Sequence, residues 1–232
     1  MNDNIRPIKV VKNYVPHAEG SCLFSMGNTK VLCVASVEDK RPPHAEEKNI
    51  GWVTGEYAML PRAGEKRTPR GKLTTGGRSQ EISRLIGRSF RSVVDLSKLG
   101  PRSITLDCDV IQADGGTRTA SINGGMIALA LALKKIYKSG AMTEWPLKDC
   151  VAAVSAGYVN GKPILDLCYE EDHVAESDMN FVMTSQGKFV EIQGTAEKTP
   201  FSEKEFQRLV DLAKKGIRQI LQIQKKVIGP LP

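Results

Sequence analysis

A glycine pair between a strand and a helix is the segment of this sequence with the clearest chemical meaning. From Gln112 to Met126 the chain reads as a strand end, then Gly115-Gly116, then a Thr117-Arg118 step that opens an apolar helix. Paired glycines permit a tight turn and the close approach of an anion. The first amides of a helix have no partner within it, and the helix dipole and the Arg118 guanidinium add positive charge there. The pattern predicts a phosphate site at Gly116, Thr117 and Arg118.

Acidic residues form a second cluster, with six of them in the thirteen positions from Asp166 to Asp178. These are Asp166, Glu170, Glu171, Asp172, Glu176 and Asp178. Surface acidity alone would explain such a cluster. A bound cation is the alternative, and carboxylates with few nitrogen or sulfur ligands nearby suit Mg²⁺ or Mn²⁺.

Positive charge is concentrated in one region. The chain has 33 Lys and Arg against 26 Asp and Glu, a net charge of +7 at pH 7. Between Arg62 and Arg91 only Glu65 and Glu81 oppose the basic residues, which are Arg62, Lys66, Arg67, Arg70, Lys72, Arg78, Arg84, Arg88 and Arg91. A diffuse excess would serve solubility, whereas a local one favours a polyanionic partner such as nucleic acid.

Several other kinds of site are excluded. The chain has no Gly-rich loop ending in Gly-Lys-Ser/Thr and no Gly-x-Ser-x-Gly segment, which argues against a P-loop nucleotidase and a serine hydrolase. The three histidines are too scattered for a zinc site. Five cysteines without a close pair, and no long apolar run, predict a reduced cytoplasmic protein without a membrane span. Reactions at phosphorus remain, where positioning and charge supply most of the catalysis.

The elements that would hold these residues follow from hydrophobic periodicity and turn residues. We expect three antiparallel strands over 8–39, a loop over 40–50, a strand over 52–59, a mobile basic loop over 61–77, a helix from Ser79, a strand over 103–111 and a buried helix over 119–139. Hairpins follow over 151–169 and 179–193, and a Ser202 and Glu205 capping box opens the last helix. This order indicates an α+β fold in which helices pack on mixed sheets.

Seven segments, in order over nearly the whole chain, resemble the ribonuclease PH family. They are His-Ala-Glu-Gly-Ser (17–21), Thr-Lys-Val-Leu-Cys (29–33), Met-Leu-Pro-Arg (59–62), Gly-Gly-Arg-Ser-Gln-Glu-Ile (76–82), the stretch from Leu106 to Ile122, Glu-Asp-x5-Asp-Met-Asn (171–180) and Gln-Gly-Thr-Ala-Glu (193–197). The resemblance implies one ribonuclease PH domain over 1–232, with the ribosomal protein S5 domain 2-like fold. It also implies a homohexamer built as a trimer of dimers.

The resemblance further implies a reaction and assigns roles. Inorganic phosphate would attack the last phosphodiester of an RNA, typically the 3′ trailer of a tRNA precursor and also rRNA, and release a nucleoside diphosphate. Arg78, Gly116, Thr117 and Arg118 match the family's phosphate site. Asp172 and Asp178 match the acidic pair that binds metal and protonates the leaving 3′ oxygen, and Arg62, Arg67 and Arg70 match the arginines that guide RNA.

Two departures and one rival function accompany the resemblance. An Arg-x-Asp-Gly-Arg segment usually precedes the position of Arg6 in the family and does not precede it here, and His173 stands where a serine is expected. The rival is a catalytically silent RNA-binding subunit of an exosome-like ring. Such a subunit is expected to lose the phosphate arginines or the acidic pair, and this chain has both.

Overall fold

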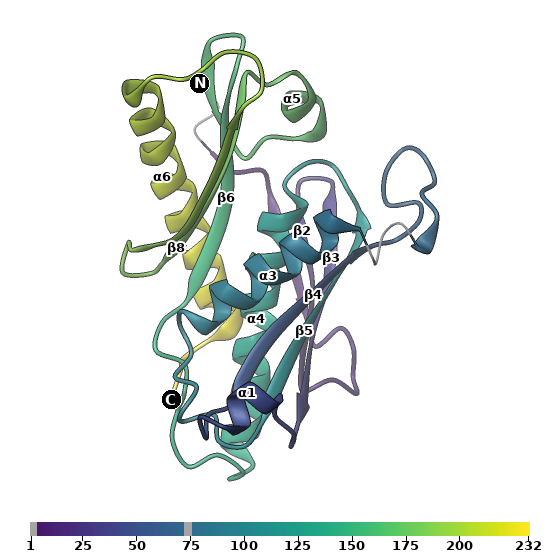
Figure 1. Cartoon of the computed structure of the whole chain (residues 1–232), viewed down its shortest axis with the longest axis vertical. Helices are drawn as coiled ribbons and strands as arrows, with labels where there is room; N and C mark the ends of the chain where they lie inside the picture. Colours follow the sequence, from purple (N-terminus) through teal and green to yellow (C-terminus); the bar gives the residue numbers. More distant parts are fainter. Residues whose placement is uncertain (1–3, 72–75) are drawn as a thin grey trace.

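The computed structural model describes residues 4–71 and 76–232, and in these residues the strands form two sheets (Figure 1). The first sheet has the order β1-β2-β3-β5-β4 and consists of β1 (Ile8–Lys12), β2 (Gly20–Met26), β3 (Thr29–Glu38), β4 (Trp52–Met59) and β5 (Ser103–Gln112). The second sheet has the order β7-β6-β8-β9 and consists of β6 (Val151–Val159), β7 (Lys162–Leu165), β8 (Ser177–Thr184) and β9 (Phe189–Ala196). The helices are α1 (Pro43–Glu46), α3 (Gly77–Arg91), α4 (Thr117–Lys138), α5 (Tyr169–Val174) and α6 (Glu203–Ile228).

The first sheet is mixed, because β4 runs parallel to β5 while its other pairs are antiparallel. The three strands predicted over 8–39 pair antiparallel, as expected, and the parallel pair makes this a mixed sheet, as the predicted fold class requires. Parallel neighbours need a long crossover connection, and the segment between β4 and β5 contains α3, which packs against β4. The apolar stripe predicted for this helix is buried, as Ile82, Leu85, Ile86 and Phe90 have at most 1% of their surface exposed.

Helix α4 lies between the inner face of the first sheet and strand β6 (Figure 1). It is buried around most of its circumference, as its uniformly apolar sequence predicts. A Cβ atom on Gly124 would lie 2.6 Å from the Cys33 sulfur, and one on Gly125 would lie 2.6 Å from Phe90 Cζ. Both glycines are therefore required by close packing.

Strand β6 is buried on both faces. Val151 and Ala153 belong to the core that includes α4, and the alternating residues Ala152 and Val154 belong to the core under α6. Helix α6 covers that second face, and the predicted capping box forms at its start, with Ser202 Oγ accepting from the Glu205 amide at 3.3 Å. Layers of sheet, helix, sheet and helix result.

Several local predictions needed correction. The loop predicted over 40–50 contains the short helix α1, which has Pro43 at its first position. The strand predicted to reach Tyr169 ends at Leu165, and Tyr169 begins α5. The basic loop is anchored at its base, because the Ala113 amide donates to the Ala63 carbonyl at 2.9 Å. Its residues 72–75, including Lys72, lie outside the described residues.

All five cysteines lie in the described part of the chain, and each is a free thiol. Over the described ranges the structure has no helix with the length and apolar character to cross a membrane.

Candidate active site

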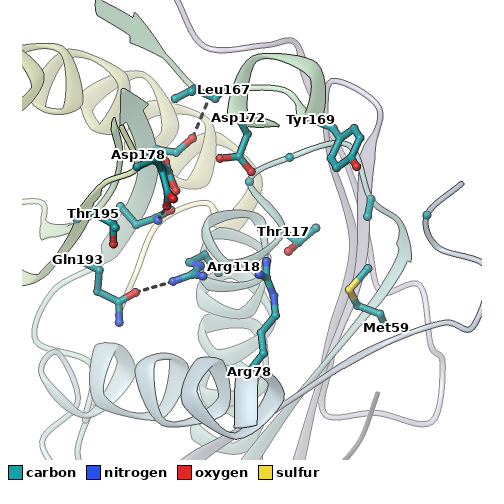
Figure 2. A pocket seen from close by; sticks show the side chains of 18 of the residues that line it. Met59, Arg78, Thr117, Arg118, Leu167, Tyr169, Asp172, Asp178, Gln193 and Thr195 are labelled. Carbon is teal, nitrogen blue, oxygen red and sulfur yellow. Dashed lines mark hydrogen bonds between the residues drawn. The ribbon is translucent and has the colours of Figure 1, made fainter. Parts of the chain in front are cut away.

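A cavity of about 720 Å³ opens between the start of α4, the start of α3 and one face of the second sheet. Its wall includes Arg78, Gly116, Thr117, Arg118, Asp172 and Asp178. Figure 2 shows Arg78 reaching from α3 toward Thr117 and Arg118, with Asp172 and Asp178 on the opposite side. The structure therefore brings the predicted phosphate residues and the predicted acidic pair to one place, from segments up to 100 positions apart in the sequence.

The glycine pair forms the turn that leads into α4. Gly115 and Gly116 have φ angles of 70° and 64°, in the left-handed region that favours glycine. Gly116 is the N-cap, and the helix starts at Thr117, two residues earlier than predicted. A Cβ atom on Gly115 would lie 2.5 Å from the Leu167 carbonyl oxygen, so this turn packs directly against the chain that enters α5. Because Gly116 has no side chain to cap the helix, the first amides of α4 face the cavity without a side-chain acceptor from the N-cap.

The buried hydroxyl group of Tyr57 is hydrogen-bonded to the first residue of α4. Tyr57 on β4 shares a hydrogen bond of 2.8 Å with Thr117 Oγ1. Burial raises the pKa of Tyr57, although the hydrogen bond with Thr117 and the positive charges of Arg78 and Arg118 act in the opposite direction. The phenol therefore remains neutral near pH 7, and both guanidiniums lie close enough to act on it.

Arg118 is held by a polar relay that crosses to α3. Its Nη1 donates to Gln193 Oε1 at 2.7 Å, and Gln193 Nε2 donates to Glu81 Oε1 at 2.9 Å and to Glu191 Oε1 at 3.0 Å. Arg88 completes the relay with two bonds to Glu191, at 2.9 Å from Nε and 2.7 Å from Nη2. The relay fixes the direction of Arg118 while leaving its charge beside the cavity.

The wall from the second sheet follows the cross-strand register. Ser155, Asn180 and Gln193 lie side by side on β6, β8 and β9, and Asp178 lies opposite Thr195 in the neighbouring row. All five line the cavity. These side chains lie on the sheet face that contacts α4. Alternate residues of a strand point to the same face, so Asp178 and Asn180 share a face with Val182, which belongs to the core around α4.

Asp178 is the most strongly perturbed acid in the cavity. Burial raises its pKa to about 6, and the negative charges of Asp172 and Glu197 add to the rise. The positive charge of Arg118 and a weak 3.5 Å hydrogen bond from Asn180 act in the opposite direction. Asp178 can therefore hold or release a proton near neutral pH.

The acidic residues that cluster in the sequence have different partners in the structure. Asp166 is only 1% exposed and binds Arg6, which donates from Nε at 3.0 Å and from Nη2 at 2.7 Å. Glu171 accepts from the Cys168 amide at the start of α5, and Glu176 accepts from the Gly161 amide. Of the six acids, Asp172 and Asp178 are the ones that line the cavity.

Arg6 joins the N-terminal segment to the phosphate loop. Besides Asp166 it donates to the Asp114 carbonyl at 2.5 Å, and Asp114 Oδ1 in turn accepts from the Tyr169 amide at 3.2 Å. The two turns that flank the cavity are therefore tied together through Arg6 and Asp114. Sequence reasoning assigned no role to either residue, or to Glu81, Gln193 and Glu197.

The three predicted RNA-guiding arginines belong to the basic loop and stand apart from the described cavity wall. The loop residues that line the cavity are Gly64, Glu65 and Lys66. Arg62 donates from Nη1 to the Glu65 carbonyl, which folds the start of the loop. Arg67 and Arg70 follow on the exposed or half-exposed continuation of the loop. This position suits contact with a substrate outside the cavity rather than with the reacting atoms.

Asp172 and Asp178 offer carboxylate ligands to a divalent cation in the cavity. Among the described residues no group of three His, Cys, Asp or Glu side chains is arranged to hold a metal ion. Two carboxylates are present, and the charge of Asp172 raises the pKa of Asp178. Mg²⁺ commonly binds proteins through one or two carboxylates together with substrate phosphates and water. The pair fits a cation that arrives with a phosphate-containing substrate.

Comparisons with known proteins identify the family of this chain. Two family models match: "3′ exoribonuclease family, domain 1" over residues 4–135, and "3′ exoribonuclease family, domain 2" over residues 149–216. Ribonuclease PH of Neisseria meningitidis serogroup C is 54% identical over 231 residues, covering 98% of this chain and 95% of the relative. Ribonuclease PH of Neisseria gonorrhoeae has the same identity and coverage.

Solved structures share the fold at low sequence identity. Rice (Oryza sativa) Rrp46 superposes with a TM-score of 0.80 at 17% identity, covering 99% of this chain and 98% of the other. The Archaeoglobus fulgidus exosome with RNA bound to the active site gives a TM-score of 0.78 at 22% identity, covering 95% and 89%. These likenesses confirm the predicted α+β fold class. The two family models and the identity to the Neisseria enzymes over nearly the full length establish that this chain belongs to the 3′ exoribonuclease family and, within it, to the ribonuclease PH group.

Proposed function

We propose that the cavity is the catalytic centre of this phosphorolytic 3′-to-5′ exoribonuclease. As a member of the ribonuclease PH group, the chain uses inorganic phosphate to remove 3′-terminal nucleotides from tRNA precursors and releases nucleoside diphosphates. In our proposal Arg78, Arg118 and the amides that follow Gly116 bind the attacking phosphate. Asp172 and Asp178 act on the oxygen that leaves.

The reaction consists of one displacement at phosphorus. An oxygen of the bound phosphate forms a bond to the phosphorus of the last phosphodiester, and the bond to the 3′ oxygen of the preceding ribose breaks. The leaving oxygen takes up a proton, and the terminal nucleotide departs with two phosphates. Arg78 and Arg118 would offset the repulsion between two anions, and the Asp178 carboxyl, with a pKa of about 6, is suited to supply the proton.

One observation carries the proposal. Positive groups at the starts of α3 and α4 and a carboxylate pair from α5 and β8 face each other across a single cavity. A phosphodiester placed between them would have the attacking anion on the side of Arg118 and the leaving oxygen on the side of Asp178. That is the arrangement which an in-line displacement requires.

A divalent cation, Mg²⁺ or Mn²⁺, would be held by Asp172 and Asp178. When bound, it would offset negative charge on the reacting phosphodiester and on the leaving oxygen. The two carboxylates also have a role of their own, because burial and the negative charge of Asp172 raise the pKa of Asp178 to about 6, close enough to neutral pH for this carboxyl to take up and release a proton.

Partners and assembly form the remaining part of the proposal. Arg62, Arg67 and Arg70 would attract the RNA strand, tRNA precursors first and rRNA second, toward the cavity mouth. We propose a homohexamer arranged as a trimer of dimers, with a particle mass of six times the 25.4 kDa chain, which light scattering would test. We also propose that residues 1–232 form one cooperative domain acting in the cytoplasm, supported by the packing of α4 on both sheets and by the free thiols.

The decisive experiment separates phosphorolysis from hydrolysis and from silent binding. The purified protein is incubated with a tRNA precursor that carries a 3′ tail, with and without phosphate and with and without Mg²⁺. We expect nucleoside diphosphates that appear only with phosphate. Release of monophosphates without phosphate would indicate a hydrolase, and RNA binding without release would favour the exosome-like silent subunit.

A pair of variants tests the phosphate site itself. Arg118→Ala should raise the KM for phosphate about 10- to 100-fold, since hydrogen bonds to charged groups contribute roughly 1.5–3 kcal/mol each. Arg84→Ala is the matched control, because Arg84 is an exposed arginine of α3 that does not line the cavity. If both variants have the same phosphate KM as the parent enzyme, Arg118 does not bind the attacking ion.

A further inference from the structure

Tyr169 is an exposed ring at the edge of the cavity. Its side chain is 53% exposed, although tyrosine usually buries its ring, and it lines the same cavity as Asp172, one helical turn further along α5. Among the described residues that line the cavity, it is the one aromatic side chain. Figure 2 shows the ring on the side of the cavity near Met59, away from Gln193 and Arg118.

The backbone that presents this ring is fixed relative to the phosphate loop. The Tyr169 amide donates to Asp114 Oδ1 at 3.2 Å, and a Cβ atom on Gly115 would lie 2.8 Å from that same nitrogen. Glu171 closes the start of the helix by accepting from the Cys168 amide at 2.9 Å. The Tyr169 backbone is therefore held at a set position beside the phosphate site, and the exposed ring does not pack into the described cores.

A second ring extends the surface. His173, one turn after Tyr169, lies with its ring centroid 6.1 Å from that of Tyr169, and the two ring planes differ by only 16°. Both side chains are exposed. Two nearly parallel rings thus leave the cavity edge along the solvent side of α5.

We propose that Tyr169, extended by His173, is a stacking platform for the unpaired bases at the 3′ end of the RNA. The proposal rests on the proposed function, and it names how that substrate is gripped. Every base offers a flat π-face, so stacking tolerates any sequence. An exonuclease that removes each nucleotide in turn needs such a contact, because hydrogen bonds to particular base edges would make it stop at some residues. Lys66, which lines the same cavity, would meet the backbone charge of the same strand.

The test uses short RNAs with 2-aminopurine at the last or second-last position, bound in phosphate-free buffer so that phosphorolysis cannot proceed. Stacking quenches this fluorophore. We expect quenching by the parent protein and by Tyr169→Phe, which keeps the ring. Tyr169→Leu should lose the quenching at one of the two positions and weaken RNA affinity by about 5- to 150-fold, which corresponds to 1–3 kcal/mol per stacked base.

Three controls make the outcome decisive. Tyr14→Leu removes a tyrosine of similar exposure, 50%, that does not line the cavity, and it should bind RNA like the parent. His173→Ala should give a smaller loss than Tyr169→Leu. The KM for phosphate should be unchanged in Tyr169→Leu, since the ring acts on the RNA.

The result that overturns the platform is full quenching and parent-like affinity in Tyr169→Leu, or equal losses in Tyr169→Phe and Tyr169→Leu. Diphosphate release by the parent enzyme is measured in parallel. If release is present and Tyr169→Leu binds normally, the function stands and the platform is wrong. If release is absent, the proposed function itself fails, whatever the quenching shows.

Discussion

Substitutions of Gln193 can test how Arg118 is positioned, because the oxygen and the nitrogen of the Gln193 side-chain amide bind different partners. The oxygen accepts from Arg118 at 2.7 Å, and the nitrogen donates to Glu81 and Glu191 at 2.9 and 3.0 Å. Gln193→Glu keeps the acceptor and replaces the donor with an oxygen that faces two carboxylates. Gln193→Leu removes both functions while keeping a similar length.

The expected magnitude follows from these bonds. A hydrogen bond to a charged group contributes about 1.5–3 kcal/mol, so losing the tether to Arg118 should raise the KM for phosphate about 10- to 100-fold. Gln193→Glu should show the same defect at pH 8, because repulsion from Glu81 and Glu191 turns its side chain away. Those neighbours also raise the pKa of the new carboxyl, so acidification protonates it and restores the donor. Its defect should therefore shrink toward pH 5.5, and that of Gln193→Leu should persist.

The assay is initial-rate phosphorolysis at varied phosphate concentration from pH 5.5 to 8.5, with each variant compared with the parent at the same pH. Gln207→Glu provides the control substitution, since Gln207 donates to Asp211 at 3.2 Å on the exposed side of α6, far from the cavity wall. It should leave the phosphate KM unchanged. If Gln193→Glu and Gln193→Leu respond to pH in the same way, or if neither changes the phosphate KM, the relay does not position Arg118.

Three further predictions concern charge and stability. The pKa of Asp178 is about 6 in the folded protein and about 3.9 when unfolded, so folding stability falls as the pH rises from about 4 to about 6. Asp178→Asn removes this charge and should therefore increase the free energy of unfolding by about 1–3 kcal/mol at pH 8 and by little at pH 4. Urea denaturation at the two pH values measures the difference. Arg6→Ala leaves the buried Asp166 without its guanidinium partner and should cost about 3–5 kcal/mol in the same assay, and a smaller loss than from an exposed control, Arg84→Ala, would contradict this. Arg67→Ala with Arg70→Ala should flatten the dependence of log RNA affinity on log salt concentration by about 1.4, and an unchanged slope would mean that neither residue meets the RNA backbone.

Local signals in the sequence were sufficient for most of the elements. The Gly115-Gly116 turn, the Asn160-Gly161 hairpin and the capping box at Ser202 each depend on residues within four positions of one another. The alternation over 103–111 and the apolar stripe from Ile82 likewise report which face of an element is buried. These features appear in the structure where the pattern placed them.

Features that depend on distant partners were not accessible in the same way. The parallel pairing of β4 with β5 needs the position of α3, which periodicity does not encode. The acids from Asp166 to Asp178 look equivalent in the sequence, and their partners decide their roles: Arg6, 160 positions away, for Asp166, and a backbone amide for Glu171. Gln193 reads as an ordinary polar strand residue until Arg118 is placed 2.7 Å from it. The resemblance supplied the candidate site, and the tertiary structure supplied the network that supports it.

The boundary between the two regions that the family models match lies next to α4. The contacts of this helix determine whether the chain could be divided there. The Asn123 side chain of α4 forms hydrogen bonds with the backbone of Ala153 on β6, as a neighbouring strand would. Its Oδ1 accepts from the Ala153 amide at 2.8 Å, and its Nδ2 donates to the Ala153 carbonyl at 2.9 Å. Gln224 of α6 adds bonds to the Asn123 and Val151 carbonyls. A fragment ending near residue 140 would contain the phosphate-binding residues but would lack Asp172 and Asp178. The complementary fragment would lack α4, which covers one face of the second sheet. Neither piece is expected to be a smaller enzyme, so a recombination that separates the two halves of this chain should lose the activity.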